Sequence, residues 1–169
     1  CTHIASAKAW QVDYERSHIH FSGDHAGISF EGSFPNFKAS IQFDPNNLES
    51  TKISANIDMK TAMVSDTLYT ETLKTTDWFD SYKFPTARYQ SKRIERIGKD
   101  KYLVTGELTI KGITKSITTT VDISINSSQA IASGKANINR TVFNIGNSSD
   151  PSGDWVSVDI PVTLHIVAK

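Results

Sequence analysis

The chain has 169 residues, and its 18 Lys and Arg residues balance its 18 Asp and Glu residues, so the formal net charge is zero. This length fits one domain with a hydrophobic core of its own, and the zero net charge gives no broad electrostatic attraction to nucleic acid or to an anionic membrane. The hydrophobic fraction of 38% excludes a disordered chain, and no apolar run approaches the ~20 residues that cross a bilayer as a helix.

The start of the chain points to export. Cys1 is the one cysteine, which excludes an internal disulfide and a cysteine-based zinc cluster. Because translation starts with Met, we expect Cys1 to be either the lipid-modified first residue of a bacterial lipoprotein or part of the end of a signal peptide. The second interpretation rests on Ala5-Ser6-Ala7, which has the form of a cleavage site. A sequence shortened for expression is the third interpretation. We expect residues 1–9 to be an exported tail and residues 10–169 to form the single domain.

Alternation of apolar and polar residues recurs along the chain. It occupies residues 19–25, 28–34, 53–59, 102–110, 117–125 and 156–166. A period of two predicts strands with one dry and one wet face, which are typical of antiparallel sheets. Turn signals at residues 44–47, 98–100, 126–128 and 147–153 separate the strands. The resulting prediction is an all-β protein, an antiparallel barrel of eight strands.

One segment breaks the strand pattern. The apolar spacing between Val64 and Leu73 predicts a short helix, and the stretch Thr76–Asp80 predicts a further helical turn. Pro85 limits how far any helix can continue. We expect this helical insertion to act as a lid over one opening of the barrel.

Aromatic residues concentrate in the first half of the chain. A barrel of about eight strands either fills its interior with side chains or holds one small ligand. Glycines on the strands remove side-chain volume or relieve bending, and core packing is the commoner fate of apolar rows. The periodicity alone therefore leaves both interiors open. The aromatics before residue 90 are Phe21, Phe30, Phe34, Phe37, Phe43, Trp78, Phe79 and Phe84.

The sequence offers no catalytic or metal-binding motif. His18 and His20 share one face of a strand, but a zinc site needs a third ligand, and the other histidines do not cluster in sequence. The chain has no Gly-x-Ser-x-Gly elbow, no paired carboxylates and no phosphate-binding loop. We predict neither an enzyme nor a metal site.

Short motifs follow one another along the chain. The first half carries Trp10-x-x-Asp13, Ser17-His18-Ile19-x-Phe21, Phe30-x-Gly32-x-Phe34, Phe43-Asp44-Pro45-Asn46, Asp77-x-Phe79-Asp80 and Phe84-Pro85-Thr86-Ala87. The second half carries Gly106-x-Leu108-Thr109-Ile110-x-Gly112, Gly134-x-Ala136-x-Ile138-Asn139-Arg140 and Phe143-x-Ile145-Gly146. From about Trp10 to the C-terminus, the chain resembles the YceI-like, polyisoprenoid-binding family.

The resemblance implies a lipocalin-like barrel, a periplasmic location and a bound isoprenoid lipid, such as a polyprenyl phosphate or an isoprenoid quinone (ubiquinone, for example). Many family members carry Arg-Asp-x-His-Leu ahead of an Asp-Phe-Phe-Asp box. Here the corresponding stretches are Tyr69–Leu73 and Asp77–Asp80. An Arg–His pair would suit an anionic head group, so its absence favours a neutral head group such as a quinone.

A carrier of this kind needs a long dry tunnel with a few polar groups at its mouth. We expect Trp78 to cover the mouth, with its indole N–H directed to a polar atom, and His25 and Arg140 to contact the head group. The alternative for Arg140 is an ion pair with Asp77 or Asp80, and for His25 a hydrogen-bonded strand or loop position. The tunnel candidates are Phe21, Phe30, Phe34, Phe43, Ile57, Leu73, Phe79 and Phe143.

Two other functions stay open: a lipid-modifying enzyme on the same barrel, and a stress-related structural protein with a filled core. The expected partner is an isoprenoid lipid and not nucleic acid. The sequence also leaves open transient contact with a membrane or a lipid-handling protein, and pairing of two chains into a homodimer.

Overall fold

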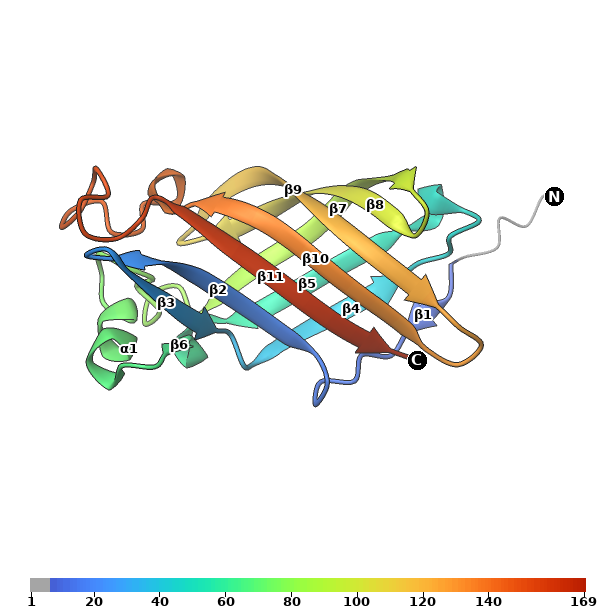
Figure 1. Cartoon of the computed structure of the whole chain (residues 1–169), viewed down its shortest axis with the longest axis horizontal. Coiled ribbons are helices and arrows are strands. Elements are labelled where there is room, and N and C mark those ends of the chain that lie inside the picture. The colour runs from blue at the N-terminus through green and yellow to red at the C-terminus, as the bar shows by residue number, and fades with distance from the viewer. Residues whose placement is uncertain (1–6) are drawn as a thin grey trace.

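A computed structural model describes residues 7–169, and these residues form one antiparallel sheet that curls around an interior (Figure 1). The order of strands across the sheet is β1-β4-β5-β7-β8-β9-β10-β11-β2-β3-β6. The strands are β1 (Ala9–Trp10), β2 (His18–His25), β3 (Ile28–Ser33), β4 (Phe37–Gln42), β5 (Lys52–Asp58), β6 (Met63–Val64), β7 (Thr86–Gly98), β8 (Lys101–Ile110), β9 (Ile113–Ile125), β10 (Ala130–Asn139) and β11 (Asp159–Ala168).

The predicted all-β antiparallel class is confirmed, but the predicted number of eight strands is wrong, because residues 7–169 form eleven. Two of the strands, β1 and β6, have only two residues each and therefore show no alternation. β3 and β4 are separated by only residues 34–36, yet they have no common neighbour in the sheet. Alternation of apolar and polar residues predicts that a segment is a strand, but it does not predict which other strands pair with it.

The first and last strands of the described chain meet at one end of the barrel. Gln11 N–H donates to the Lys169 carbonyl at 2.9 Å, and Lys169 N–H donates to the Gln11 carbonyl at 2.9 Å. The segment after β1 thus pairs with the end of β11, while β1 itself pairs with β4. Figure 1 shows β2, β10 and β11 crossing in front of β4 and β5, so the curled sheet forms two crossing layers. Ala9, which we expected in the N-terminal tail, begins β1; Cys1 lies outside the described residues.

Two groups of buried side chains occupy the two ends of this interior. The group near the chain termini consists of Trp10, Phe43, Ile94, Tyr102, Val104, Val121, Ala130 and Ala168. The group at the opposite end consists of Met59, Ala62, Phe79, Ala87, Ala136, Ile138, Phe143 and Ile145. Neither group fills the stretch between them, and the cavity described below occupies it.

The predicted helix is present but shorter than expected. α1 spans Thr67–Leu73 and lies at the end of the barrel away from the termini (Figure 1). The side chain of Asp66 caps it by accepting hydrogen bonds from the backbone N–H groups of Leu68 at 2.8 Å and Tyr69 at 3.2 Å. Val64 itself ends β6 (Met63–Val64), which is why the helix does not begin there.

The other connections are turns and single helical turns. The predicted helical turn at Thr76–Asp80 is a run of turns instead. Three short 3-10 helices occur within the described residues, at Leu48–Ser50, Met59–Thr61 and Arg140–Phe143. The predicted hairpin tips at residues 98–100 and 126–128 are confirmed, since they connect β7 to β8 and β9 to β10.

Candidate functional site: an apolar cavity inside the barrel

The interior of the barrel holds a cavity of about 880 Å³. Side chains of all eleven described strands and of α1 line it, and most of them are apolar. Its walls run from Trp10 and Phe43 beside the chain termini to Tyr69 and Leu73 on α1. Ligand pockets in proteins usually measure roughly 300–1,000 Å³, so this space is large enough for a lipid.

Packed aromatic rings close the end of the cavity near the chain termini. The Trp10 indole Nε1–H donates to the Phe43 carbonyl at 3.0 Å, and the Phe43 ring meets the Tyr102 ring edge-to-face at 5.5 Å. All three side chains are buried. This hydrogen bond satisfies the only polar atom of the indole, so the closed end stays apolar.

The opposite end of the cavity is open between α1 and the β2–β3 hairpin. Ile28 in the hairpin is 74% exposed and Tyr69 on α1 is 46% exposed, and both also line the cavity. The His25 ring packs edge-to-face on Tyr69 at 4.9 Å. Ala26 N–H donates to the Trp155 carbonyl at 2.7 Å, which ties the loop before β11 to the hairpin. We call this opening the mouth.

Most of the predicted tunnel residues line the cavity. Phe21, Phe34 and Phe79 form a continuous aromatic row, with ring centroids 4.9 Å apart for Phe21 and Phe34 and 6.0 Å apart for Phe34 and Phe79. The predicted residues on the lining are Phe21, Phe30, Phe34, Phe43, Ile57, Leu73, Trp78 and Phe79. The role of these residues in binding stays a prediction.

Phe143 does not belong to the lining and corrects the predicted set. It lies in the 3-10 helix Arg140–Phe143, is 1% exposed and packs among side chains of the core. The strand β10 ends at Asn139, so its alternation of inward and outward side chains no longer applies at Phe143, four residues further on.

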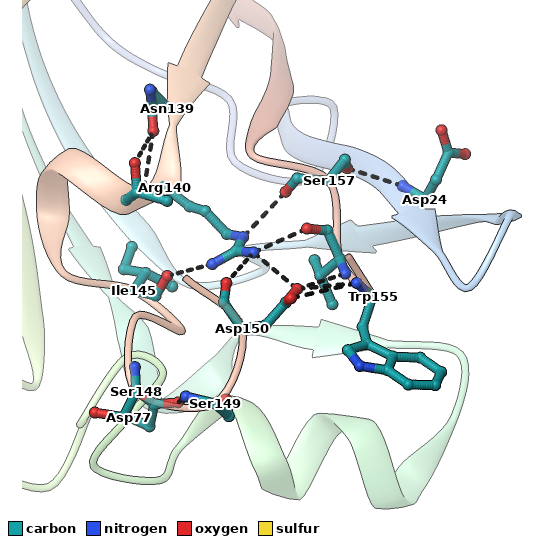
Figure 2. Close-up of polar contacts among 12 residues, drawn as sticks. Asp24, Asp77, Asn139, Arg140, Ile145, Ser148, Ser149, Asp150, Trp155 and Ser157 are labelled. Atoms are coloured by element: carbon teal, nitrogen blue, oxygen red, sulfur yellow. Dashed lines mark hydrogen bonds and ion pairs between the residues drawn. The ribbon is translucent and has the colours of Figure 1, made fainter. Parts of the chain in front are cut away.

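Arg140 is buried beside the mouth, and protein acceptors surround its guanidinium group (Figure 2). Nε–H donates to the Ser157 carbonyl at 3.0 Å, and Nη1–H donates to the Ile145 carbonyl at 2.8 Å. Nη2–H donates to the Val156 carbonyl at 2.8 Å and to the Asp150 carboxylate at 3.0 Å. The ion-pair partner is therefore Asp150, and not Asp77 or Asp80 as the sequence suggested.

The carboxylate of Asp150, like the guanidinium group of Arg140, has hydrogen-bond partners within the protein. Its carboxylate accepts the backbone N–H of Val156 at 2.8 Å and that of Trp155 at 3.2 Å. The hydrogen bond from Val156, followed by those from Trp155 and the charge of Arg140, holds the pKa of Asp150 below its ordinary value despite burial. Arg140 and Asp150 thus join the loops at this end of the barrel, which leaves Arg140 little capacity for a ligand.

Trp78 covers part of the mouth, with its ring 5.5 Å from the guanidinium carbon of Arg140. It contacts Arg140 through this cation–π interaction, and within residues 7–169 its indole N–H finds no hydrogen-bond acceptor, contrary to our expectation. His25, the other predicted head-group residue, lines the mouth at the end of β2. Its backbone forms an isolated antiparallel β-bridge with Val156.

A second polar cluster fixes the loop that carries Trp78 and Phe79. The Asp77 carboxylate accepts the backbone N–H groups of Ser148 at 2.8 Å and Ser149 at 2.9 Å, and also the Ser149 hydroxyl (Figure 2). Burial raises the pKa of Asp77, but the hydrogen bonds from Ser149 and Ser148 outweigh it, so the pKa lies below its ordinary value. Lys111 Nζ–H donates to the carbonyls of Thr76 at 3.0 Å and Asn144 at 2.7 Å.

Among the polar lining residues that the sequence analysis did not identify, two lie away from the mouth. Tyr89 on β7 and Thr119 on β9 both face the cavity, away from the mouth residues. Thr119 stands between Ile117 and Val121 in an inward row, and a hydroxyl in such a row is the signal that could have identified it. No such signal marks Tyr89, because apolar and polar residues alternate only weakly in the sequence around it.

Metal and membrane-spanning features do not occur in the described part of the chain. Residues 7–169 contain no group of three or more His, Cys, Asp or Glu side chains that could hold a metal ion. His18 and His20 pack together on the outer face of β2 with ring centroids 5.7 Å apart. None of the described helices is both long and apolar enough to cross a membrane.

The comparison with protein families settles the family. The YceI-like domain model matches residues 10–168. The chain belongs to the YceI-like family. A UPF0312 protein of Vibrio vulnificus is 31% identical over 117 residues, and protein YceI of Escherichia coli is 29% identical over 117 residues. The matched segment covers 68% of this chain but only 62% and 61%, respectively, of these two YceI-like relatives.

Three solved structures share the fold. The crystal structure of BcnA from Burkholderia cenocepacia has a TM-score of 0.90 and 30% identity, covering 94% of this chain and 100% of that one. The YceI protein of Campylobacter jejuni has a TM-score of 0.70 and 25% identity, covering 82% of this chain and 84% of that one. A polyisoprenoid binding domain from Saccharophagus degradans, implicated in plant cell wall breakdown, has the same fold at 11% identity, with a TM-score of 0.72 and coverage of 95% and 97%.

Proposed function

We propose that this YceI-like chain is a carrier that holds one long isoprenoid lipid in its cavity without changing it chemically. The observation that carries the proposal is the apolar cavity of about 880 Å³, closed at one end and open at the other. Each CH₂ group removed from water contributes ~0.8 kcal/mol, so a chain of tens of carbons has a large driving force to enter. The ordering of the lipid chain opposes much of this gain.

The walls of the cavity favour a carrier over the two alternatives. A structural protein with a filled core would place side chains where the cavity lies. A lipid-modifying enzyme needs a free acid or base near the bound chain. Of the titratable lining residues, Asp66 caps α1, and Arg140 is bonded to backbone carbonyls and Asp150. Burial raises the pKa of Tyr89 to about 12, so its hydroxyl stays protonated and is a poor acid or base at neutral pH. His25 lies at the mouth, away from most of the cavity wall.

The lipid in this proposal has a neutral head group, such as an isoprenoid quinone of the ubiquinone type, because Arg140 is engaged by the protein. Entry and exit take place past α1, which acts as the lid, during transient contact of the mouth with a membrane. Exposed apolar side chains at this end support such contact: Ile28 is 74% exposed, Leu68 73% and Trp155 63%.

A periplasmic location, with or without a lipid on Cys1, is part of the same proposal and rests on the family resemblance. Cell fractionation tests the location, and the mass of the protein isolated from its native bacterium tests the modification of Cys1. Recovery of the protein in the cytoplasmic fraction would refute this part of the proposal.

Extraction of the purified protein with organic solvent, followed by mass spectrometry, tests the carrier. We expect one isoprenoid lipid per chain, chemically unchanged on incubation. Ala132→Trp introduces a large ring on the cavity wall and should abolish the copurified lipid. Ile131→Trp introduces the same ring one residue earlier on β10, on the outer face, and should leave the lipid in place. A well-folded wild-type protein that carries no lipid would refute the carrier.

A further inference from the structure

Two hydroxyl groups interrupt the apolar wall in the half of the cavity that is closed. They belong to Tyr89 on β7 and Thr119 on β9, the strands on either side of β8. Thr119 pairs with Val104, and Gly106 lies two residues further along β8. Val104 belongs to the buried group at the closed end, whereas Leu108, the pairing partner of Tyr89, packs against the group at the opposite end. The two hydroxyls therefore lie near the middle of the cavity, deeper than the mouth. We call the part of the cavity from this level to Trp10 and Phe43 the closed half.

Gly106 determines where the Tyr89 hydroxyl lies. A Cβ atom on residue 106 would lie 2.4 Å from Tyr89 Oη and 2.5 Å from Cζ, so the ring rests directly on the bare backbone of β8. The absence of a side chain at this position lets the ring extend along the wall from its pairing partner Leu108 toward the closed end. The hydroxyl is thereby placed among apolar side chains.

The Tyr89 hydroxyl is neutral and has no partner within residues 7–169. Burial raises the pKa of Tyr89 to about 12, and no hydrogen bond contributes to this shift. The group therefore stays protonated and able to donate. Leaving such a group unpaired in an apolar environment costs free energy, which a hydrogen bond to a ligand oxygen would recover.

The charged lining residues restrict the kind of oxygen. The basic groups on the lining are His25 and Arg140, and both lie at the mouth end, where Arg140 is held by Asp150. The closed half offers hydroxyl groups and aromatic rings, Trp10 and Phe43 among them, but no cation to balance a phosphate. An uncharged planar head group suits these walls.

From these observations we infer that the isoprenoid enters head first: its uncharged head group lies in the closed half of the cavity, where the Tyr89 hydroxyl donates a hydrogen bond to an acceptor oxygen such as a quinone carbonyl, and its tail extends to the mouth. The inference rests on the proposed carrier function. It differs from the sequence-based expectation, which placed the head group at the mouth on His25 and Arg140.

The test compares two ligands and two matched variants. The ligands are a ubiquinone with a short isoprenoid tail and squalene, an isoprenoid hydrocarbon without a head group. Tyr89→Phe removes one hydroxyl from the closed half, and Tyr69→Phe removes one from the mouth. Affinities are measured by fluorescence titration, and the carbonyl stretching frequency of the bound quinone is measured by infrared spectroscopy.

Loss of one hydrogen bond should weaken quinone binding to Tyr89→Phe by about threefold to tenfold. The carbonyl frequency should rise, squalene binding should not change, and Tyr69→Phe should behave as wild type for both ligands. Equal affinity and carbonyl frequency in wild type and Tyr89→Phe would overturn the inference, as would an effect confined to Tyr69→Phe. If wild type binds neither ligand, the proposed carrier function itself is refuted. This outcome differs from those that refute only the position of the head group.

Discussion

The guanidinium of Arg140 and the carboxylate of Asp150 form an ion pair with an Nη2–Oδ2 distance of 3.0 Å and side-chain exposures of only 3% and 5%. The pair joins the end of β10 to the loop that precedes β11, next to the mouth of the cavity. A buried pair with this many hydrogen bonds holds a loop in one conformation, whereas either partner alone would be a buried charge without compensation.

Breaking this pair should strongly destabilise the protein. Asp150→Asn leaves the buried charge of Arg140 uncompensated, and removal of one partner of a buried pair typically costs about 3–5 kcal/mol. Urea denaturation followed by tryptophan fluorescence measures the loss. The control is Arg16→Gln, whose exposed ion pair with Asp13 at 3.7 Å should contribute less than about 1 kcal/mol. Similar losses in both variants would contradict the structural role of Asp150.

Acid should weaken the fold through Asp77 and Asp150. The pKa of each lies below its ordinary value of 3.8 in the folded protein. A carboxyl group of this kind stabilises the fold above its unfolded pKa, and that contribution is lost as the pH falls through its folded pKa. We therefore expect the free energy of unfolding to decrease below about pH 4.

The Asp77→Asn variant isolates one of these two carboxyl groups. It lacks the titrating group that accepts hydrogen bonds from Ser148 and Ser149. Its free energy of unfolding should be lower than that of wild type at neutral pH and should decline less on acidification. Urea titrations from about pH 6 to pH 3 make the comparison, because this range includes the unfolded pKa of Asp near 3.9. Parallel curves for variant and wild type would rule out a role of Asp77 in the acid response.

Two phenylalanine truncations should distinguish the core from the cavity wall. Phe143 is 1% exposed and packed on all sides, so Phe143→Ala should cost about 3–5 kcal/mol. Phe34 already faces the cavity on one side, so Phe34→Ala loses fewer contacts and should cost less in the lipid-free protein. Urea denaturation of delipidated protein gives both values. Equal losses would mean that the Phe34 ring is packed as tightly as a core residue.

Gly32 should not tolerate a side chain, although its position in β3 is an ordinary strand position. A Cβ atom there would lie 2.2 Å from Cζ of Phe21, a buried ring. Gly32→Ala should therefore destabilise by about 1–3 kcal/mol through overpacking. At Gly98 the nearest atom to an added Cβ is Lys101 Cβ at 3.5 Å, an ordinary contact. Thermal denaturation should show a clearly lower Tm for Gly32→Ala than for Gly98→Ala.

Alternation in the sequence predicted much of the wall of the cavity. Residues of one parity in a strand share a face whatever the number of strands, so Phe21, Phe30 and Ile57 reach the lining although the predicted strand count was wrong. The short strands β1 and β6 offered no period to detect. Beyond the end of β10, at Phe143, the prediction of a cavity-lining position failed, because this ring is buried in the core.

The polar part of the site was harder to predict, because irregular loops supply the partners. Arg140 meets Asp150 only because the loop after the 3-10 helix Arg140–Phe143 turns back toward it. Asn144 in this loop adopts a left-handed conformation with φ of 59°, which no periodicity reveals. Tyr89 depends on the space above Gly106, a relation between two strands that neither residue shows alone.

The backbone pairing of Gln11 with Lys169 has a practical consequence. Because the ends of the described chain lie side by side at the closed end (Figure 1), a short peptide could join them without crossing the mouth. New termini could then be opened in the exposed hairpin at residues 98–100. In such a circular permutant the mouth would stay exposed. Immobilising the natural chain through Lys169 would leave the mouth facing away from the support.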